Sequence, residues 1–227
     1  MIEYLLITAA GIGPAVSNRA RLEALSRAIQ YYKPLGCNII VALTKSVFDD
    51  YALTNLASKE SLISYSIVPN GVKGALATAN FALASHGAEW GKLHIAAGDT
   101  HFTDDSALEA ISRLSSSNVD AGALVFESDD IRHSFVSLDE SDNVRFVAEK
   151  KLVGKFATSG NFYFADIKDF VDASEWCFVN NSNLEGNFFV STALNYYVYQ
   201  GKQVKVESIN PNSIAKLWSS ARATYRG

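Results

Sequence analysis

The chain has 227 residues, 48% of them hydrophobic and 19% charged, which excludes disordered and collagen-like proteins and leaves room for one large α/β domain or two small ones. Its net charge of −4 provides no basic surface for a phosphate backbone, so nucleic acid is not an expected partner, whereas a small phosphorylated ligand is compatible. The two cysteines, Cys37 and Cys177, lie in apolar stretches, and we expect them to be reduced core residues because two cysteines cannot form a disulfide framework or a zinc site.

The first residues do not have the pattern of a targeting segment. MIEYLLITAAG carries Glu3 where a signal peptide has basic residues, and its apolar run is too short to cross a bilayer. We therefore expect no signal peptide, no transmembrane helix and no membrane partner, and a cytoplasmic location by default.

Up to about residue 118, strand-length hydrophobic runs alternate with segments of helical period, a pattern typical of βαβ units and a mostly parallel sheet. Leu22, Leu25 and Ile29 recur at helical spacing ahead of Pro34 and Gly36, which predicts a helix that ends there. The expected strands are 4–10, 37–44, 64–69 and 92–99, and the expected helices are 21–36, 47–58, 74–87 and 107–117.

Beyond residue 118 the pattern changes to four successive short strands, at 121–128, 133–141, 143–150 and 160–167, with a turn at 141–143 between the middle two. This succession predicts an antiparallel portion of the sheet. Helices at 167–179 and 185–201, a strand at 203–209 and a closing helix at 213–225 are expected to follow. Since no linker or repeat divides the sequence, we expect one domain over residues 1–227.

Two loops after predicted strands carry residues suited to a nucleotide. AAGIG, at 9–13, follows the first strand, and glycines there let backbone N–H groups approach a phosphate, although a glycine pair after a strand is also found in plain turns. Asp99 ends a hydrophobic strand, where a carboxylate is costly unless it is paired or binds a cation such as Mg²⁺. We interpret Asp99 as a metal ligand, and Asp104 and Asp105 as caps of the helix that begins near Ser106.

Three further acidic positions invite two interpretations each. Glu149 and Lys150 end a strand. Lys150 would pair with a phosphate while Glu149 orients the lysine or accepts from a sugar hydroxyl, or the two would form a solvated strand end. Glu185 is expected to open a helix, where the macrodipole favours its charge with or without a ligand. Glu207 ends the last strand, and Asn210 precedes a proline that suits the first turn of a helix.

Seven short motifs follow one another in a defined order over nearly the whole chain. They are AAGIG (9–13), GVKGALATA (71–79), AAGD (96–99), AEKK (148–151), SGNFYF (159–164), LEGNFFVSTAL (184–194) and ESINPNSI (207–214). This order resembles that of a divergent member of the NTP-dependent sugar-phosphate nucleotidyltransferases, a family that includes cytidylyltransferases. Its members carry AAGxGxR, GtagAl, a strand ending in GD, EKP, GxY, an acid at a helix start, and DINTPEDL.

The resemblance implies a Rossmann-like, three-layer α/β/α sandwich with a mixed, mostly parallel central sheet. It implies transfer of NMP from an NTP to a sugar phosphate or alcohol phosphate, with release of pyrophosphate, in making an activated precursor for cell-surface polysaccharide. The implied cofactor is Mg²⁺, and the implied partners are an NTP and a small phosphorylated substrate.

The site residues that the resemblance implies fall into three groups. The nucleotide-binding group is Ala9, Ala10, Gly11, Gly13, Asn70, Gly71, Gly74, Ala75 and Gly98. The substrate-binding group is Glu149, Lys150, Gly160, Asn161 and Glu185, and the metal-binding pair is Asp99 and Glu207. Asp99 and Lys150 would be catalytic.

One departure from the family concerns the signature lysine that stabilises charge on the triphosphate. No lysine lies between Pro14 and Arg27, and Arg19 or Arg21 would have to substitute, although a forked guanidinium is not equivalent to an ammonium. A binding homologue with weakened catalysis is therefore an alternative hypothesis. A small glycosyltransferase is a third, but GDTH, at 98–101, lacks the second aspartate of its Asp-x-Asp metal motif.

Tyr196, Tyr197 and Tyr199 form an aromatic run in a predicted helix. They would either pack in the core or face a partner subunit of a homo-oligomer.

Overall fold

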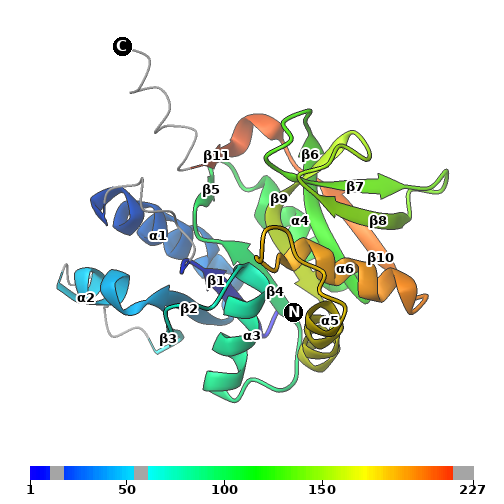
Figure 1. Ribbon diagram of the computed structural model, residues 1–227. Helices are drawn as coiled ribbons and strands as arrows, with labels where there is room; N and C mark the ends of the chain where they lie inside the picture. Colours follow the sequence, from blue (N-terminus) through cyan, green and yellow to red (C-terminus); the bar gives the residue numbers. More distant parts are fainter. Residues whose placement is uncertain (11–17, 54–60, 217–227) are drawn as a thin grey trace, which may run out of the picture.

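The computed structural model describes residues 1–10, 18–53 and 61–216 (Figure 1). Within these residues the chain forms a nine-stranded sheet with helices on both faces, together with a separate two-stranded ribbon. The expected α/β class is confirmed.

The elements alternate between strand and helix over the first part of the chain and then become richer in strands. The strands are β1 (Tyr4–Thr8), β2 (Asn38–Thr44), β3 (Ile63–Val68), β4 (Leu93–Ala97), β5 (Thr100–Phe102), β6 (Ala121–Glu127), β7 (Ser134–Leu138), β8 (Val144–Glu149), β9 (Phe156–Phe164), β10 (Val204–Ser208) and β11 (Ile214–Lys216). The helices are α1 (Asn18–Tyr32), α2 (Lys45–Leu53), α3 (Ala75–His86), α4 (Ser106–Ser116), α5 (Ile167–Val179) and α6 (Val190–Tyr199), with 3₁₀ turns at Lys33–Leu35 and Pro211–Ser213.

The main path of the sheet has the order β10-β6-β9-β4-β1-β2-β3. β1 pairs in parallel with β2 and β4, β2 with β3, and β6 with β10, whereas β9 runs antiparallel to both β4 and β6. β9 is therefore the one reversed strand on this path through the described residues. The hairpin of β7 and β8 joins the sheet through β9 and supplies the antiparallel portion that the sequence predicts.

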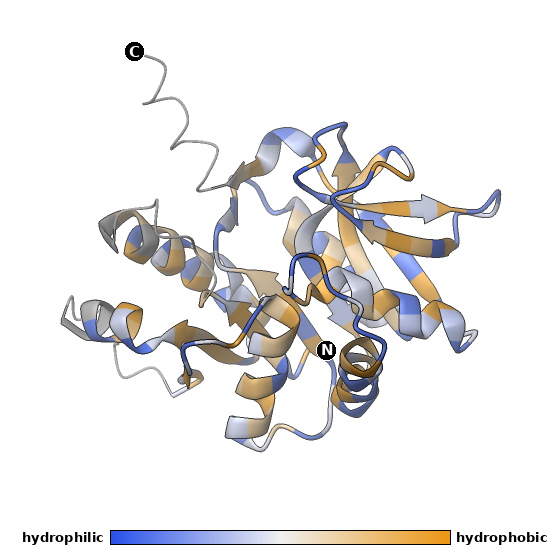
Figure 2. Ribbon diagram, viewed as in Figure 1, coloured by the Kyte–Doolittle hydropathy of each residue, from blue (hydrophilic) through white to orange (hydrophobic). Residues whose placement is uncertain are grey.

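Two hydrophobic cores lie on opposite faces of the sheet and give the three-layer α/β/α sandwich that the resemblance implies. One contains buried side chains of α3, α5 and α6, and the other contains buried side chains of α1, α2 and α4. β4 shows how one strand serves both: Leu93 and Ile95 pack in the first core, while Ala96 packs in the second. Since successive side chains of a strand point to opposite faces, a strand covered on both sides is apolar throughout. Figure 2 shows the central strands and the inner helix faces as hydrophobic.

Several detailed expectations are confirmed. α5 has the predicted bounds, and Cys37 and Cys177 are buried and unpaired. Asp104 caps α4, because its carboxylate accepts a hydrogen bond from the backbone N–H of Ser106 at 3.0 Å, whereas Asp105 occupies the N-cap position without a side-chain bond.

Other expectations are wrong at element ends. β5 and β11 form an antiparallel pair that the sequence did not predict, so the closing helix expected at 213–225 does not begin there, and its remainder lies outside the described residues. α6 begins at Val190 rather than at 185, because Glu185 and Gly186 have φ angles of 52° and 77°, which no right-handed helix adopts.

The aromatic run of α6 divides between core and surface, with Tyr197 buried and Tyr199 74% exposed. None of the helices in the described part of the chain is long and apolar enough to span a bilayer.

Phe170 of α5 tests the core beneath α5 and α6. Its ring is fully buried and lies 4.7 Å from the ring of Phe164 on β9, between centroids. Replacing Phe170 by alanine is expected to lower the free energy of unfolding by about 3–5 kcal/mol, because it removes buried apolar area and leaves a cavity. Phe146→Ala, at a position 44% exposed, is the matched control and should cost less than about 1 kcal/mol in urea unfolding followed by circular dichroism. Equal losses would contradict this placement of Phe170.

Candidate functional site

A cleft of about 640 Å³ opens on the α3 and α6 face of the sheet, beyond the carboxyl ends of β1 and β4. Its lining comes from β1, α3, β4, the β7–β8 hairpin, β9 and the segment that leads into α6. Ligands of open α/β sheets bind beyond strand carboxyl ends, where side chains and backbone groups can leave the core without being buried. The cleft is therefore the candidate site.

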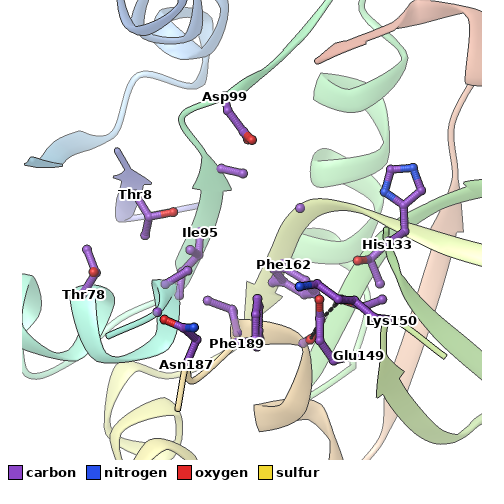
Figure 3. Close-up of a pocket in the computed structure, with 18 of the residues that line it drawn as sticks. Thr8, Thr78, Ile95, Asp99, His133, Glu149, Lys150, Phe162, Asn187 and Phe189 are labelled. Atoms are coloured by element: carbon purple, nitrogen blue, oxygen red, sulfur yellow. Dashed lines mark hydrogen bonds between the residues drawn. The ribbon is translucent and has the colours of Figure 1, made fainter. Parts of the chain in front are cut away.

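Asp99 follows β4 and lines the cleft, with its carboxylate directed into the hollow (Figure 3). The loop is packed closely against the one that follows β1: the N–H of Gly98 donates to the carbonyl of Thr8 at 3.0 Å, and a Cβ on Gly98 would lie 3.0 Å from that of Ala9. Asp99 is half-buried, and the hydroxyl of Thr100 donates to its Oδ1 at 3.3 Å. One oxygen of the carboxylate is thus oriented by its own loop.

Gly74 and Ala75 line the cleft at the start of α3. The N–H of Leu76 donates to the carbonyl of Phe188 at 3.0 Å, and the N–H of Phe188 donates to the carbonyl of Lys73 at 3.3 Å. A Cβ on Gly74 would lie 2.1 Å from the Phe188 carbonyl oxygen, so glycine is required for the two backbones to meet. This contact holds the segment before α6 against the first turn of α3.

Glu149 and Lys150 both line the cleft, although consecutive residues of a strand point to opposite faces. Lys150 adopts a left-handed conformation, with φ of 51°, and its N–H donates to the carbonyl of His133 at 3.0 Å. This reversal at the strand end brings both side chains into one hollow, as Figure 3 shows. The ammonium of Lys150 lies 5.8 Å from the ring centroid of Phe189.

The carboxylate of Glu149 is held by two hydroxyl groups. Oε2 accepts a short hydrogen bond from Ser134 of β7 and a second, of 3.1 Å, from Ser191 of α6. Neither serine was expected at the site. The predicted turn at 141–143 carried a signal for Ser134, because folding the chain about that turn brings it opposite the end of β8, but nothing in the sequence indicates that Ser191 faces Glu149.

The expected substrate contact of Asn161 is wrong. Gly160 lines the cleft, but Asn161 is fully buried on the other face of the sheet. There the Tyr32 hydroxyl donates to its Oδ1 at 2.6 Å, and His94 Nε2 lies 2.9 Å from the same oxygen. Burial, partly offset by this hydrogen bond, lowers the pKa of His94 to about 4. Gly160 and Asn161 thus lie on opposite faces of the sheet, as the alternation of strand residues predicts.

Glu207 does not join Asp99 in a metal site. It lies on β10, which two strands separate from β4, and its carboxylate forms an ion pair with Arg113 of α4 at 2.7 Å (Figure 1). Three strand spacings amount to roughly 14 Å. Nowhere in the described residues do three His, Cys, Asp or Glu side chains gather as a metal site would require.

The other predicted residues occupy varied positions. Glu185 is exposed in the turn before α6 and does not open a helix, and Asn70 and Gly71 are exposed ahead of α3. Ala9 is buried and Ala10 packs against the core beside α3. Gly11 and Gly13 lie outside the described residues, and the side chains of Arg19 and Arg21 are likewise outside them. The cleft residues Arg132, His133 and Phe189 were not predicted.

No family model and no curated protein sequence matches the chain. Solved structures match it over nearly its whole length. A putative glucose-1-phosphate thymidylyltransferase from Bacillus anthracis, in complex with a sucrose, has a TM-score of 0.76 at 16% identity, covering 99% of this chain and 95% of that one.

Two further structures show the same similarity. HddC from Yersinia pseudotuberculosis, complexed with GMP-PN, has a TM-score of 0.66 at 19% identity and covers 100% of both chains. A nucleoside-diphosphate-sugar pyrophosphorylase from Vibrio cholerae has a TM-score of 0.65 at 14% identity, covering 96% of this chain and 98% of that one. At these identities the similarity establishes the fold.

Gly74 tests the backbone contact between α3 and the segment before α6. Gly74→Ala is expected to lower the free energy of unfolding by about 2 kcal/mol more than Gly71→Ala, because overpacked sites cost this much. Both glycines have positive φ angles, 89° at Gly74 and 100° at Gly71, but a Cβ on Gly71 would meet no atom within 4 Å. The difference between the two losses of unfolding free energy therefore measures the clash with Phe188. Urea unfolding of the two variants measures it. Equal losses would mean that the backbones do not meet at Gly74.

His94 predicts a pH dependence of stability. Its pKa is lowered in the folded state from 6.5 to about 4, so between these values the unfolded chain binds a proton that the native protein does not. Stability is therefore lost as the pH falls through this window, at about 1.4 kcal/mol per pH unit. Between pH 7 and pH 5 the free energy of unfolding of the wild type should fall by about 2 kcal/mol more than that of His94→Gln. Above pH 7 the free energies of unfolding of the two proteins should change in parallel with pH. Parallel curves below pH 6 would contradict a buried, neutral His94.

Proposed function

We propose that the chain transfers a nucleotidyl group from an NTP to the phosphate of a small sugar phosphate or alcohol phosphate and releases pyrophosphate. The observation that carries the proposal is that one cleft brings together Asp99, the first turn of α3 and Lys150. The names of the solved structures with this fold, a thymidylyltransferase and a pyrophosphorylase among them, support it.

The nucleotide end of the cleft is assigned to the side formed by β1 and α3. The N-terminus of a helix favours an anion through the helix dipole and its N–H groups. At α3 the N–H of Leu76 is already bound to the Phe188 carbonyl, so the dipole and the other N–H groups of the first turn remain. Gly74 and Ala75 line the cleft at this turn, and Thr8 and Thr78 add hydroxyl groups to the same wall. The helix N-terminus suits part of the triphosphate, and the wall with the two hydroxyl groups suits the uncharged ribose and base.

The residues present fit Mg²⁺ only as an ion that arrives with the nucleotide. Mg²⁺ commonly takes one or two carboxylates and completes its shell with substrate phosphates and water. Asp99 offers one half-buried carboxylate in the cleft, whereas Glu207 is engaged by Arg113. Asp99 would hold the ion, which, when bound, supplies neutralisation of phosphate charge.

The acceptor end is assigned to Glu149 and Lys150. The ammonium of Lys150 pairs with the acceptor phosphate, and the carboxylate of Glu149 accepts from a neighbouring hydroxyl. An acceptor phosphate oxygen then attacks the α-phosphorus, the new P–O bond forms in line with the bond that breaks, and pyrophosphate leaves with that bonding pair. Lys150 contributes by stabilising charge on the reacting phosphates.

The proposed product is an activated sugar or alcohol nucleotide. We assign such a product to the supply of precursors for cell-surface polysaccharide. Because NTPs are cytoplasmic substrates, the proposal also assigns the activity to the cytoplasm.

A second candidate function is binding of a nucleotide or nucleotide-sugar without turnover. The ion pair between Glu207 and Arg113 favours it, because the position that resembles a second metal ligand is not available to a metal. The absence of a lysine between Pro14 and Arg27 favours it as well.

Pyrophosphate release distinguishes the two functions. The protein is incubated with each of the four NTPs, Mg²⁺ and a panel of sugar 1-phosphates, and we expect one combination to give turnover. Measurable NTP binding without turnover in any combination would reject the transferase and leave the binding function.

Asp99→Asn is the variant that tests the site within this assay. Turnover should fall by roughly 100-fold or more, because a neutral amide would hold Mg²⁺ poorly and the ion's neutralisation of phosphate charge would be lost. Asp172→Asn, which removes a surface ion pair with Lys168 of 2.8 Å on α5, is the control and should keep wild-type turnover. Full activity of Asp99→Asn would show that the site is assigned to the wrong residue.

A further inference from the structure

Glu149 is the one acid of the acceptor half of the cleft whose orientation the protein determines in detail. Oε2 accepts from Ser134, which lies directly opposite Glu149 in the β7–β8 register, and from Ser191 of α6. No group in the described part of the chain hydrogen-bonds Oε1. Three elements therefore meet at one oxygen and leave the other available.

The support continues along α6 and β8. The side chain of Asn195 accepts from the N–H of Val147 at 2.7 Å and donates to its carbonyl at 2.9 Å, and so completes the free edge of β8. Ser191 and Asn195 are one turn apart on α6, which corresponds to a rise of about 6 Å along the helix axis. Val147 and Glu149 are two residues apart on β8, which corresponds to a separation of about 6.6 Å along the strand. Because the two spacings match, one face of α6 holds the strand and its terminal acid together.

The reason for holding one oxygen lies in the freedom of a glutamate side chain. The last torsion of glutamate is broad, so an unsupported carboxylate presents its oxygens in many directions. Two hydroxyl donors on Oε2 select one direction and leave Oε1 as a single acceptor beside Lys150, as Figure 3 shows for the two side chains. A preorganised acceptor recognises a hydroxyl at one position of a ligand without paying the cost of ordering itself.

We propose that Ser134 and Ser191 are positioning residues that orient the Glu149 carboxylate to read one hydroxyl of a sugar phosphate. The inference rests on the proposed function of the cleft, and it deepens that function by assigning a polyhydroxylated acceptor to Glu149. Ser134 and Ser191 act through Glu149 and do not themselves contact the sugar.

The test measures the binding of hexose 1-phosphates by calorimetry, with the 1-phosphates of glucose, mannose and galactose as probes. For the hexose that binds tightest, the monodeoxy analogues are then compared. One analogue should bind the wild type at least about tenfold more weakly than the parent hexose 1-phosphate does, since the loss of a hydrogen bond to a charged acceptor lowers affinity by about that factor. In the double variant Ser134→Ala with Ser191→Ala, the affinity for the same analogue should be less than about threefold below that for the parent hexose 1-phosphate, because the carboxylate is no longer directed at that hydroxyl.

Two further variants separate positioning from stability. Ser191→Thr keeps a hydroxyl and should keep the discrimination. Ser174→Ala removes a buried hydroxyl that donates to the carbonyl of Phe170 in α5 at 2.8 Å, away from the cleft, and should leave discrimination unchanged. A loss of discrimination in Ser174→Ala would indicate a general structural effect and overturn the inference.

Unchanged discrimination in the double variant overturns the role of the serines even if the wild type releases pyrophosphate. Lost discrimination in a protein that binds the sugar phosphate but never releases pyrophosphate supports the role of the serines and rejects the transferase. A wild type that binds none of the three hexose 1-phosphates overturns the inference.

Discussion

Burial of the sheet on both faces is the constraint on which the remaining structure depends. Side chains of β1, β2 and β4 pack against α1 and α4 on one side and against α3 on the other, so these strands carry few groups that can bind a polar ligand. Polar groups can leave the core only where the strands end. Asp99 lies at such an end, and for this reason its carboxylate reaches the cleft while the rest of β4 stays apolar.

The reversed strand β9 explains why the cleft has two unlike halves. One half comes from the parallel strands and the first turn of α3, which offer backbone groups and Asp99. The other half depends on β9, which brings the β7–β8 hairpin and α6 to the same face and with them Glu149 and Lys150. The backbone contact between Gly74 and Phe188 joins the two halves.

In the proposed function, Lys150 is the cation that pairs with a phosphate, and the positions of the acids limit how a metal would take part. Asp99, Glu149 and Lys150 lie in one hollow, and Glu207 is balanced by Arg113 at the far edge of the sheet. A single carboxylate binds Mg²⁺ weakly without phosphate oxygens, so in the proposed function metal and nucleotide binding would depend on each other. On the opposite face, Tyr32, His94 and Asn161 form a buried polar cluster that anchors α1 to the sheet and takes no part in the cleft.

Hydrophobic periodicity and strand-ending residues in the sequence alone determined the α/β class, most of the succession of elements, and Asp99 and Lys150 as candidates, because these signals are local. Gly74 became a candidate only through the order of motifs that resembles a known family. Only the tertiary structure decided which candidates face the cleft. Asn161 turns away because strand side chains alternate, Glu207 is too far because β9 and β6 lie between β10 and β4, and Ser191 reaches Glu149 because α6 matches the spacing of β8. The positions of Glu207 and Ser191 depend on contacts between residues distant in the chain, which no local pattern of residue types encodes.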